Sequence, residues 1–306
     1  MSGRRKALRP EASAAPFRCG EVAIVGRPSV GKSTLLNALV GARVSITSRR
    51  PQTTRGRVRG ILTTDAAQFV FVDTPGFQTR HRSLLNERMN RAVRESLNGV
   101  DVIVAVLEAR GPTGQDRALF ALLPESVPAI AAVNKIDRLA DKSLLLPVIA
   151  EIAAAHDFGA IVPVGAEKRL QLDELLGAIE SRLPAGPPRF PSDELTDRDE
   201  RFLAAEFLRE KIFRQLGEEV PYAVAVAIDT FRHEGALRRI HATVYVDKAS
   251  QRTIVLGEGG VRMKEIASAA RRDMERLFGG KVFLEVWVRV KPDWANDERM
   301  LARLGY

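Results

Sequence analysis

The chain has little cysteine and no long apolar run, and each shortage excludes a class of protein. Its 306 residues contain one cysteine, Cys19, so no disulfide can form within the chain, which fits a reducing cytoplasm. No uninterrupted apolar stretch reaches the ~18 residues that a membrane-spanning helix needs. The first twenty residues carry five basic side chains and one acidic one, without the apolar segment of a signal peptide. We therefore expect a cytoplasmic protein with a disordered basic tail over residues 1–19.

Acidic residues are scarce in one part of the chain only. The formal net charge is +9, which indicates a polyanionic partner. Residues 190–306 contain equal numbers of acidic and basic side chains, so the excess lies before residue 190. Within that part, one stretch has no acidic residue. Its functional interpretation is contact with the polyanion, and the alternative interpretation is an ordinary solvated surface. This stretch, residues 43–60, holds Arg43, Arg49, Arg50, Arg55, Arg57 and Arg59.

What the chain does contain is four short motifs in the order that a guanine-nucleotide site requires. The first matches G-x-x-x-x-G-K-S/T between an apolar stretch at residues 21–25, expected to be a strand, and a helix from Ser33. Amides at the start of that helix point at an anion, and the helix dipole adds positive charge there. We expect Lys32 to reach the β and γ phosphates and the Ser33 hydroxyl to bind Mg²⁺. The predicted nucleotide contacts of this loop are Gly26, Arg27, Pro28, Ser29, Val30, Gly31, Lys32, Ser33 and Thr34.

The second and third motifs are expected to surround the γ phosphate. Thr54 lies in the arginine-rich stretch, and Asp73 ends an apolar run at residues 69–72 that suits a buried strand. Ligands sit at the carboxyl edge of such a sheet, so we expect Asp73 to serve Mg²⁺ through water, together with Ser33 and Thr54. The amide of Gly76 is placed to sense the γ phosphate. The predicted catalytic residues are Lys32, Thr54 and Gly76, and the predicted nucleotide contacts of the third motif are Asp73, Thr74, Pro75, Gly76 and Phe77.

The fourth motif predicts the choice of base. Residues 134–137 follow an apolar stretch at residues 129–133, and the carboxylate of Asp137 can accept from both the ring N–H and the exocyclic amine of guanine. Adenine would leave this carboxylate unpaired, and a site of that kind rejects the wrong partner strongly. A last loop after residues 160–164 is expected to offer the Ala166 amide to the guanine carbonyl oxygen. The predicted base contacts are Asn134, which braces the loop, Lys135, Ile136, Asp137 and Ala166.

A linker and a second domain follow. Residues 184–200 are rich in proline and polar residues, which predicts a linker between domains at 20–183 and 201–306. Hydrophobic spacing in the second domain predicts helix, strand, strand, helix, strand, with a G-x-x-G turn at residues 257–260 before the inner helix. Such a turn lets a nucleic-acid backbone approach, as in KH domains, which clamp about four nucleotides; an ordinary glycine turn is the alternative. The predicted RNA contacts are Gly257, Glu258, Gly259, Gly260, Arg262, Lys264, Arg271 and Arg272.

These motifs and four further segments resemble the Era family of bacterial ribosome-assembly GTPases over roughly residues 20–306. The further segments are Ser45-Ile46-Thr47-Ser48-Arg49-Arg50-Pro51-Gln52-Thr53-Thr54-Arg55, Leu85-Asn86-Glu87-Arg88-Met89-Asn90, Glu285-Val286-Trp287-Val288-Arg289-Val290-Lys291 with Trp294, and Leu304-Gly305-Tyr306. The resemblance implies an α/β, Ras-like P-loop GTPase domain with a doubly wound, mostly parallel sheet, followed by an α+β type II KH domain. It also implies GTP hydrolysis with GTP, GDP and Mg²⁺ as ligands, and binding of the 3′ end of 16S ribosomal RNA during assembly of the small (30S) subunit. A monomer with peripheral contact to the inner membrane is implied by the resemblance alone.

Four positions depart from what the resemblance implies or from small GTPases in general. Ser29 stands where the family commonly has an asparagine that helps to hold potassium, which puts stimulation by K⁺ in question. Gly165 replaces the usual serine of the last guanine loop and is expected to loosen that loop. Glu258 places an acid inside the clamp turn, and we expect it to point outward because it would otherwise repel RNA. Phe77 stands in place of a water-orienting glutamine, so we expect slow intrinsic hydrolysis that a partner or another group accelerates.

The functional hypothesis is a switch. The γ phosphate is expected to order Thr54 and Gly76, and these loops set the docking of the second domain and expose its RNA clamp. Two rivals remain. An RNA- or protein-modifying enzyme that uses GTP for conformational work would need a Cys/His cluster or a nucleophile beside a base, and the second half of the sequence shows neither. A GTP-regulated protein or membrane scaffold would bind its partner independently of salt, whereas phosphate contacts weaken steeply with salt.

Overall fold

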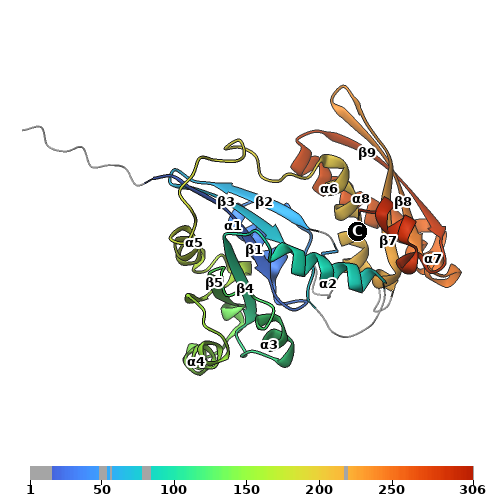
Figure 1. The fold of residues 1–306 in the computed structure, drawn as a ribbon. Helices are drawn as coiled ribbons and strands as arrows, with labels where there is room; N and C mark the ends of the chain where they lie inside the picture. Colours follow the sequence, from blue (N-terminus) through green and yellow to red (C-terminus); the bar gives the residue numbers. More distant parts are fainter. Residues whose placement is uncertain (1–15, 48–53, 56, 78–83, 217–219, 306) are drawn as a thin grey trace, which may run out of the picture.

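The computed structural model describes residues 16–47, 54–55, 57–77, 84–216 and 220–305. The chain forms an α/β domain followed by an α+β domain that lies against it (Figure 1). The first strand begins at Arg18, so the end of the expected basic tail belongs to the first sheet, while residues 1–15 of that tail lie outside the described residues. Among the described residues, no helix is long and apolar enough to cross a membrane.

The first domain is built on a six-stranded sheet in the order β2-β3-β1-β4-β5-β6. All neighbouring strands are parallel except β2 and β3, which are antiparallel. The chain winds outward from β1 in both directions, and in such sheets ligands bind at the carboxyl ends of the strands beside this switch point. The strands are β1 (Arg18–Val25), β2 (Val58–Thr63), β3 (Ala67–Asp73), β4 (Val102–Glu108), β5 (Ala129–Asn134) and β6 (Ala160–Pro163).

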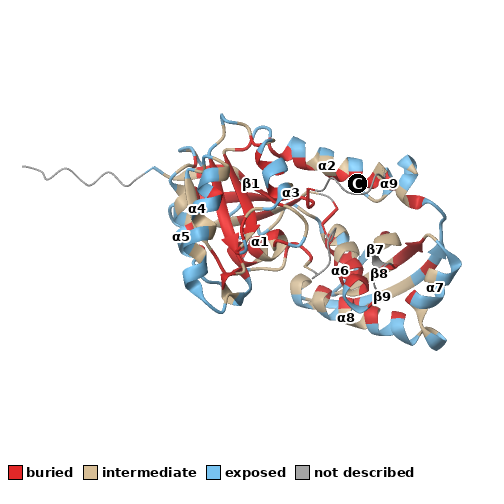
Figure 2. Ribbon diagram, turned by 90° about the horizontal axis from the view of Figure 1, so that it is seen from below, coloured by how far each residue is buried: buried red, intermediate tan, exposed pale blue. Residues whose placement is uncertain are grey.

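Helices cover both faces of this sheet, and the buried strands run through the middle of the domain (Figure 2). The pleat sends alternate residues to opposite faces. Val22 and Ile24 of β1 therefore join the core under α1 and α5, while Ala23 of the same strand joins the core under α2, α3 and α4. Strands buried on both faces have continuous apolar sequences, which explains why residues 69–72 and 129–133 predicted β3 and β5 correctly. The helices are α1 (Lys32–Val40), α2 (Leu84–Ser96), α3 (Gly114–Phe120), α4 (Leu145–Ala155) and α5 (Leu172–Glu180).

The second domain packs two helices, α6 and α8, on one face of a three-stranded sheet. The strand order is β7-β8-β9, with β7 and β8 antiparallel and β8 and β9 parallel. Phe207 of α6 and Ile266 and Met274 of α8 fill the core against this sheet. The elements are α6 (Glu200–Gln215), β7 (Val224–Glu234), β8 (Leu237–Val246), α7 (Ala249–Leu256), α8 (Val261–Phe278), β9 (Lys281–Val290) and α9 (Glu298–Arg303).

The predicted order of elements in this domain lacks two helices, α7 and α9. The order in the structure is helix, strand, strand, helix, helix, strand, helix, in which α9 follows β9. Helix α7 precedes the glycine turn and ends with the apolar residues 254–256. This helix has eight residues, and Val255 is the one that is buried. An apolar run that short cannot be assigned to helix or strand from its periodicity.

The segment expected to be a linker is bound along the first domain. The Cys19 amide donates to the carbonyl of Pro184 at 3.1 Å, and the amide of Arg189 donates to Oε1 of Gln68 at 2.7 Å. Further along, the Ile61 amide donates to the carbonyl of Leu195 at 2.9 Å, at the edge strand β2. The proline-rich segment is therefore an ordered strap that stays attached to the sheet until a few residues before α6 begins.

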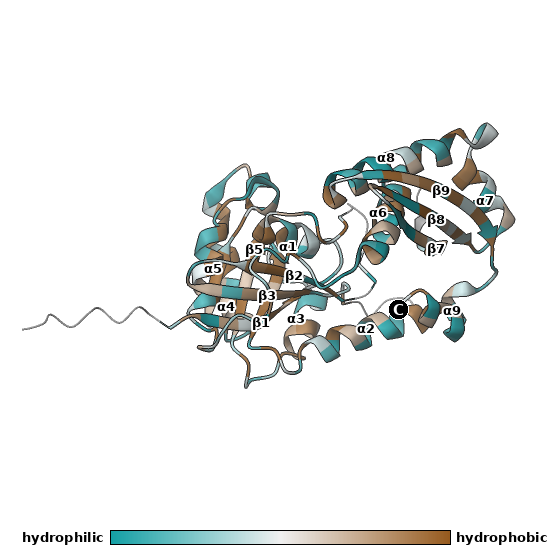
Figure 3. Ribbon diagram, turned by 90° about the horizontal axis from the view of Figure 1, so that it is seen from above, coloured by the Kyte–Doolittle hydropathy of each residue, from teal (hydrophilic) through white to brown (hydrophobic). Residues whose placement is uncertain are grey.

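The two domains share a small apolar core of their own. Leu85 and Met89 of α2 pack with Tyr245 of β8 and with Trp294 and Leu301 from the C-terminal segment. Figure 3 shows α8 on one side of the second sheet and α2 with α9 beyond the other side. The helix that follows the third nucleotide motif is thus part of the contact between the domains.

Candidate nucleotide site and nucleic-acid groove

The phosphate loop connects the end of β1 to the start of α1, as the sequence predicted. Gly31 has φ +104°, in a region that favours glycine, and an added Cβ would lie 2.3 Å from Nδ2 of Asn134. Ser29 also has a positive φ of 66°, so the loop turns sharply there. Ser33 and Thr34 lie in the first turn of α1, whose backbone amides have no carbonyl partners within the helix.

Lys32 lies within the phosphate loop. Its Nζ donates to the carbonyls of Gly26 and Arg27, both at 3.1 Å, and the residue is 6% exposed. Burial lowers the pKa of the Lys32 ammonium to about 8, and the nearby Asp73 opposes that shift. A phosphate in the loop would restore the charged form, because opposite charge favours it.

Three hydroxyl groups converge on the carboxylate of Asp73. Ser33 and Ser45 donate to Asp73 Oδ2 at 2.7 and 2.8 Å, and Thr54 does so at 3.2 Å. The Ser33 and Thr54 hydroxyls are 2.9 Å apart. Burial raises the pKa of Asp73, while Lys32 and the three hydroxyls oppose that shift.

This cluster fits a magnesium ion. Oδ1 of Asp73 is buried and has no hydrogen-bond partner among the described residues. Hard oxygen donors from hydroxyls and one carboxylate are the ligands that Mg²⁺ uses beside a nucleotide phosphate. Ser33, Thr54 and Asp73 are therefore brought together as the sequence predicted, and Ser45 joins them. Sequence reasoning missed Ser45, although it begins the family segment quoted above.

The third motif packs directly on the phosphate loop. A Cβ on Gly76 would lie 2.7 Å from Cα of Pro28, so only glycine allows this approach. The Phe77 amide donates to the carbonyl of Gly26 at 3.2 Å, and the Thr74 hydroxyl donates to that of Ile24 at 2.9 Å. The Phe77 ring is buried in the core under α2, which means that its backbone and not its ring faces the loop. Pro75 is buried as well.

Asn134 joins three loops. Its Nδ2 donates to the carbonyl of Val30 at 3.0 Å, while its Oδ1 accepts from the amides of Lys135 at 2.8 Å and Ala166 at 3.1 Å. The bracing role expected of Asn134 thus extends from the phosphate loop to the last guanine loop. The Ala166 amide was expected to serve the base, and here it already serves Asn134, so a base would have to share it.

Asp137 lies three residues beyond the end of β5. It is half-buried in a short 3₁₀ helix, Ile136–Arg138, and accepts no hydrogen bond from the residues that the structure describes. A Cβ on Gly165 would lie 3.2 Å from Asp137 Oδ1 and 3.1 Å from Cδ1 of Leu170. Two hydrogen bonds close the loop that Gly165 was expected to loosen, since its amide and carbonyl pair with those of Leu170 at 3.1 and 3.0 Å.

Glu108 is a residue that sequence reasoning missed. It accepts from Arg27 at 2.9 Å and pairs with Lys135, whose Nζ also donates to the Ser29 carbonyl at 2.7 Å. Burial would raise the pKa of Glu108, but hydrogen bonds from Lys135 and Arg27 outweigh it and lower that pKa. The sequence did contain a signal for Glu108, because it is an acidic residue at the end of the apolar run of β4, just as Asp73 is at the end of β3.

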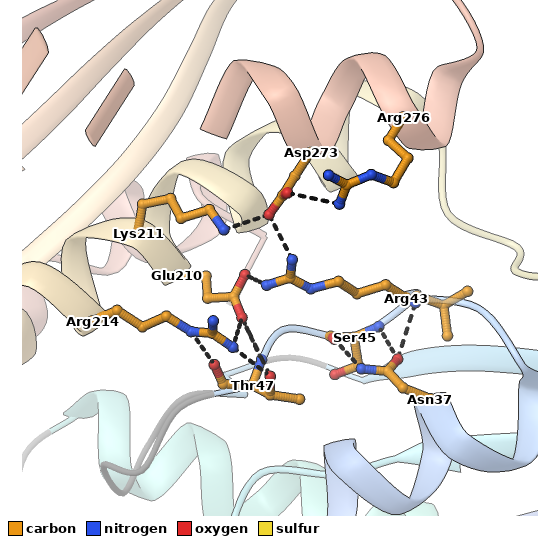
Figure 4. A network of polar contacts seen from close by, with 10 residues as sticks. Asn37, Arg43, Ser45, Thr47, Glu210, Lys211, Arg214, Asp273 and Arg276 are labelled. Carbon is orange, nitrogen blue, oxygen red and sulfur yellow. Dashed lines mark hydrogen bonds and ion pairs between the residues drawn. The ribbon is translucent and has the colours of Figure 1, made fainter. Parts of the chain in front are cut away.

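The arginine-rich stretch contacts protein where the structure describes it. Arg43 pairs with Glu210 of α6 and Asp273 of α8 (Figure 4). Glu210 is fully buried and also accepts from the Thr47 amide at 3.1 Å and from Arg214 at 2.9 Å. The other described arginines of this stretch also have partners in the protein. Arg55 donates to the carbonyls of Tyr222 and Val224, Arg57 pairs with Glu95, and Arg59 pairs with Glu21 and Asp197. In this arrangement these four side chains bind groups of the protein itself, and Arg57 and Arg59 remain partly exposed. Arg49 and Arg50 lie outside the described residues.

A groove of about 410 Å³ lies beside the glycine turn, between α8 and the edge strand β9. Gly260, Lys264 and Arg271 line one side of it, and Leu284 and Glu285 of β9 line the other. Gly257, Gly259 and Gly260 all have positive φ, as a tight turn before a helix requires.

The predicted RNA contacts divide into two groups. Lys264 and Arg271 line the groove, but Arg262 donates back to the carbonyl of Ile254 at 2.7 Å and Arg272 is exposed without lining the groove. Glu258 is exposed at the turn and does not line the groove.

Comparison with known proteins agrees with both halves. A family model described as "50S ribosome-binding GTPase" matches residues 21–135, and a KH domain model matches residues 219–295. GTPase Era of Chromobacterium violaceum is 54% identical over 290 residues, which covers 95% of this chain and 98% of the relative. The structure of an Aquifex aeolicus Era variant bound to GDP·AlF4⁻ superposes with a TM-score of 0.92 at 39% identity, covering 95% of this chain and 99% of that one. Era in complex with MgGDPNP and nucleotides 1506–1542 of 16S ribosomal RNA gives a TM-score of 0.91 with the same identity and coverage.

The agreement spans both domains in one order and one arrangement, and the relatives are matched over almost their whole length. The GTPase motifs, the KH-type second domain and the contact between them occur together. This chain therefore belongs to the Era family of GTPases.

Proposed function

We propose that this protein is a GTP-operated switch that binds the 3′ end of 16S ribosomal RNA and assists assembly of the small ribosomal subunit. The observation that carries the proposal is the position of Thr54 and Arg55. The Thr54 hydroxyl contacts Ser33 and Asp73 in the nucleotide site, and the next residue, Arg55, is 2% exposed with its guanidinium bound to the second domain.

On the nucleotide side, each group has a role that its position supports. Lys32 and the amides at the start of α1 would hold the β and γ phosphates, and Asp137 would read the base. Asn134 holds the loops around that base in register. Mg²⁺, when bound by Ser33 and Thr54 near Asp73, would neutralise phosphate charge as the γ phosphoryl group leaves.

Hydrolysis is expected to be slow without a partner. The Phe77 ring is buried in the core and cannot orient water, so catalysis rests on Lys32, on Thr54 and on the Gly76 amide. These groups position the phosphates and stabilise the negative charge that develops on them, which is most of what phosphoryl transfer needs. None of them orients the attacking water by a hydrogen bond. The Ser29 carbonyl accepts a hydrogen bond from Nζ of Lys135 at 2.7 Å.

On the RNA side, the groove between α8 and β9 fits a single strand. The related Era protein was solved with nucleotides 1506–1542 of 16S ribosomal RNA. Gly257 and Gly260 would let the backbone approach, with Lys264 and Arg271 as its phosphate contacts. We further propose that the protein acts as a cytoplasmic monomer and that it binds this RNA within the pre-ribosomal 30S particle. Peripheral contact with the inner membrane has the family resemblance as its one support.

RNA binding measured in two nucleotide states tests the proposal. Labelled RNA of nucleotides 1506–1542 should bind more tightly to the protein with Mg²⁺ and a GTP analogue than with GDP, and its affinity should fall steeply with salt. Lys264→Ala and Arg271→Ala should each weaken binding and reduce the salt slope by about 1. Arg272→Ala is the matched control, because this exposed arginine of α8 does not line the groove.

Two results would overturn the proposal in different ways. Equal RNA affinity in both nucleotide states would remove the coupling between the domains. Binding that ignores salt and is unchanged in both Lys264→Ala and Arg271→Ala would favour the rival scaffold function.

A further inference from the structure

The sheet of the second domain has a face that α6 and α8 do not cover. Val282, Leu284, Val286 and Val288 of β9 belong to the core under those helices. Side chains alternate along a strand, so the residues between them point to the opposite face. Among the described residues, α2 and α9 cover that face, here called the outer sheet face, near Ala225, Ala227 and Tyr245.

Two large aromatic side chains lie on the open part of the outer sheet face. Phe283 is 41% exposed and Trp287 is 56% exposed. They are four residues apart on β9, which separates them by about 13 Å at the usual rise of a strand. Single exposed apolar residues are common, but two aromatic rings on one face of an edge strand form a surface that bases can stack on.

The neighbours of these rings suit a polyanion. Arg239 lies opposite Phe283 in the sheet, and its guanidinium is 4.7 Å from the centre of that ring. The His241 ring is 6.4 Å from the Phe283 ring. By the alternation of side chains, the open part of the face carries four basic and two acidic side chains. The basic ones are Arg232, Arg239, Lys281 and Arg289, and the acidic ones are Glu234 and Glu285. At the border of the face, Asp229 pairs with Arg303 at 3.1 Å.

The outer sheet face is continuous with the RNA groove. Leu284, Glu285 and Val286 of β9 line the groove, and Phe283 and Trp287 are the next residues on either side along the same edge strand. A strand leaving the groove can cross β9 to reach the outer sheet face, since β9 is the edge of its sheet in the part of the chain that the structure describes.

We propose that Phe283, Trp287 and the basic side chains beside them form a second single-stranded RNA site, on which bases stack after the strand leaves the groove. This inference rests on the proposed RNA-binding function and extends it. A KH-type groove holds about four nucleotides, and the outer sheet face would bind those that follow.

Intrinsic fluorescence tests this directly, because the chain has two tryptophans and only one is exposed. Trp294 is 1% exposed and donates from Nε1 to the Ala223 carbonyl at 2.8 Å, so RNA cannot stack on it. Saturating the intact protein with RNA of nucleotides 1506–1542 should quench the emission that Trp287→Phe removes. Fragments of that RNA shortened to about four nucleotides should bind the groove without this quenching.

Affinity provides the second measurement. Stacking contributes ~1–3 kcal/mol per base, so Trp287→Ala should weaken binding of the long RNA by about tenfold and leave the short fragments unaffected. Leu146→Ala is the control, because Leu146 is 74% exposed on α4 of the other domain. Thermal unfolding of both variants should match the parent, since both side chains are largely in solvent.

The outcomes separate this inference from the function on which it rests. RNA that binds with unchanged Trp287 emission and equal affinity for Trp287→Ala overturns the second site alone. A protein that binds no RNA overturns both. A concentration-dependent dimer that Trp287→Ala abolishes would assign the outer sheet face to a second copy of the chain and also overturn the inference.

Discussion

Replacing Arg55 by alanine should separate the two domains. Its guanidinium donates to the carbonyl of Val224 at 2.8 Å and to that of Tyr222 at 3.1 Å. It also lies over the rings of Phe213 and Trp294, at 5.7 and 5.3 Å from their centres. Both domains therefore lose contacts at one point when this side chain is removed.

The magnitude follows from these contacts. A hydrogen bond from a charged donor contributes about 1.5–3 kcal/mol, and a partly buried cation–π contact contributes about 0.5–2 kcal/mol. The four contacts share one group and do not add fully, so we expect a loss of about 3–5 kcal/mol from the contact between the domains. With a urea dependence of about 2 kcal/mol per molar for one domain, the transition of the second domain should move down by about 2 M.

Urea unfolding followed by the emission of Trp294 measures this, because that ring is buried at the contact and becomes exposed when the domains part. Arg57→Ala is the control, since Arg57 pairs at 3.2 Å with Glu95 in a largely exposed ion pair, and such pairs contribute about 0–1 kcal/mol. A second transition that appears in Arg55→Ala and is absent from Arg57→Ala is the expected result. Identical curves for the two variants would refute the reasoning.

Three further predictions concern the nucleotide site. Asp137→Asn should exchange a preference for GTP for one for xanthosine triphosphate in competition binding, and retained GTP selectivity would contradict the assigned base contact. Burial lowers the pKa of Lys32 from 10.5 to about 8, so between these pH values the unfolded chain holds a proton that the folded chain has lost. The free energy of unfolding of the nucleotide-free protein should therefore rise by about 1 kcal/mol per pH unit in that window relative to Lys32→Met, and a flat difference would count against it. Phe77→Gln should cost about 2–4 kcal/mol of stability, because it buries an amide in an apolar core, without speeding single-turnover hydrolysis; a faster rate would show that position 77 can reach the water.

The nucleotide site could be predicted from sequence because its groups come from short local motifs at the ends of apolar strands. Asp73 and Asn134 each end a buried strand, and parallel strands bring their ends to one sheet edge. Ser45 and Glu108 could not be assigned in the same way. Their roles depend on which loop and strand end lie beside the motifs, and that is set by tertiary packing.

The contact between the domains was beyond sequence reasoning for a different reason. Arg43 and Arg55 stand in an acid-free stretch, and their partners lie more than 150 residues further along the chain. Local composition therefore suggested a polyanion where the structure has a buried carboxylate, Glu210, and two backbone carbonyls. The proline-rich strap was interpreted as a linker for a related reason. Its hydrogen bonds go to backbone and side-chain groups of the first domain, such as Gln68, which local composition does not reveal.

The attachment of that strap limits how the molecule can move. Because the chain is held to the first domain as far as Arg198, whose guanidinium donates to the Arg57 carbonyl, little more than Asp199 is left before Glu200 to act as a hinge. A tether that short keeps the second domain at a high effective concentration beside the first even after release. Reclosure is then a local rotation and not a search through solution.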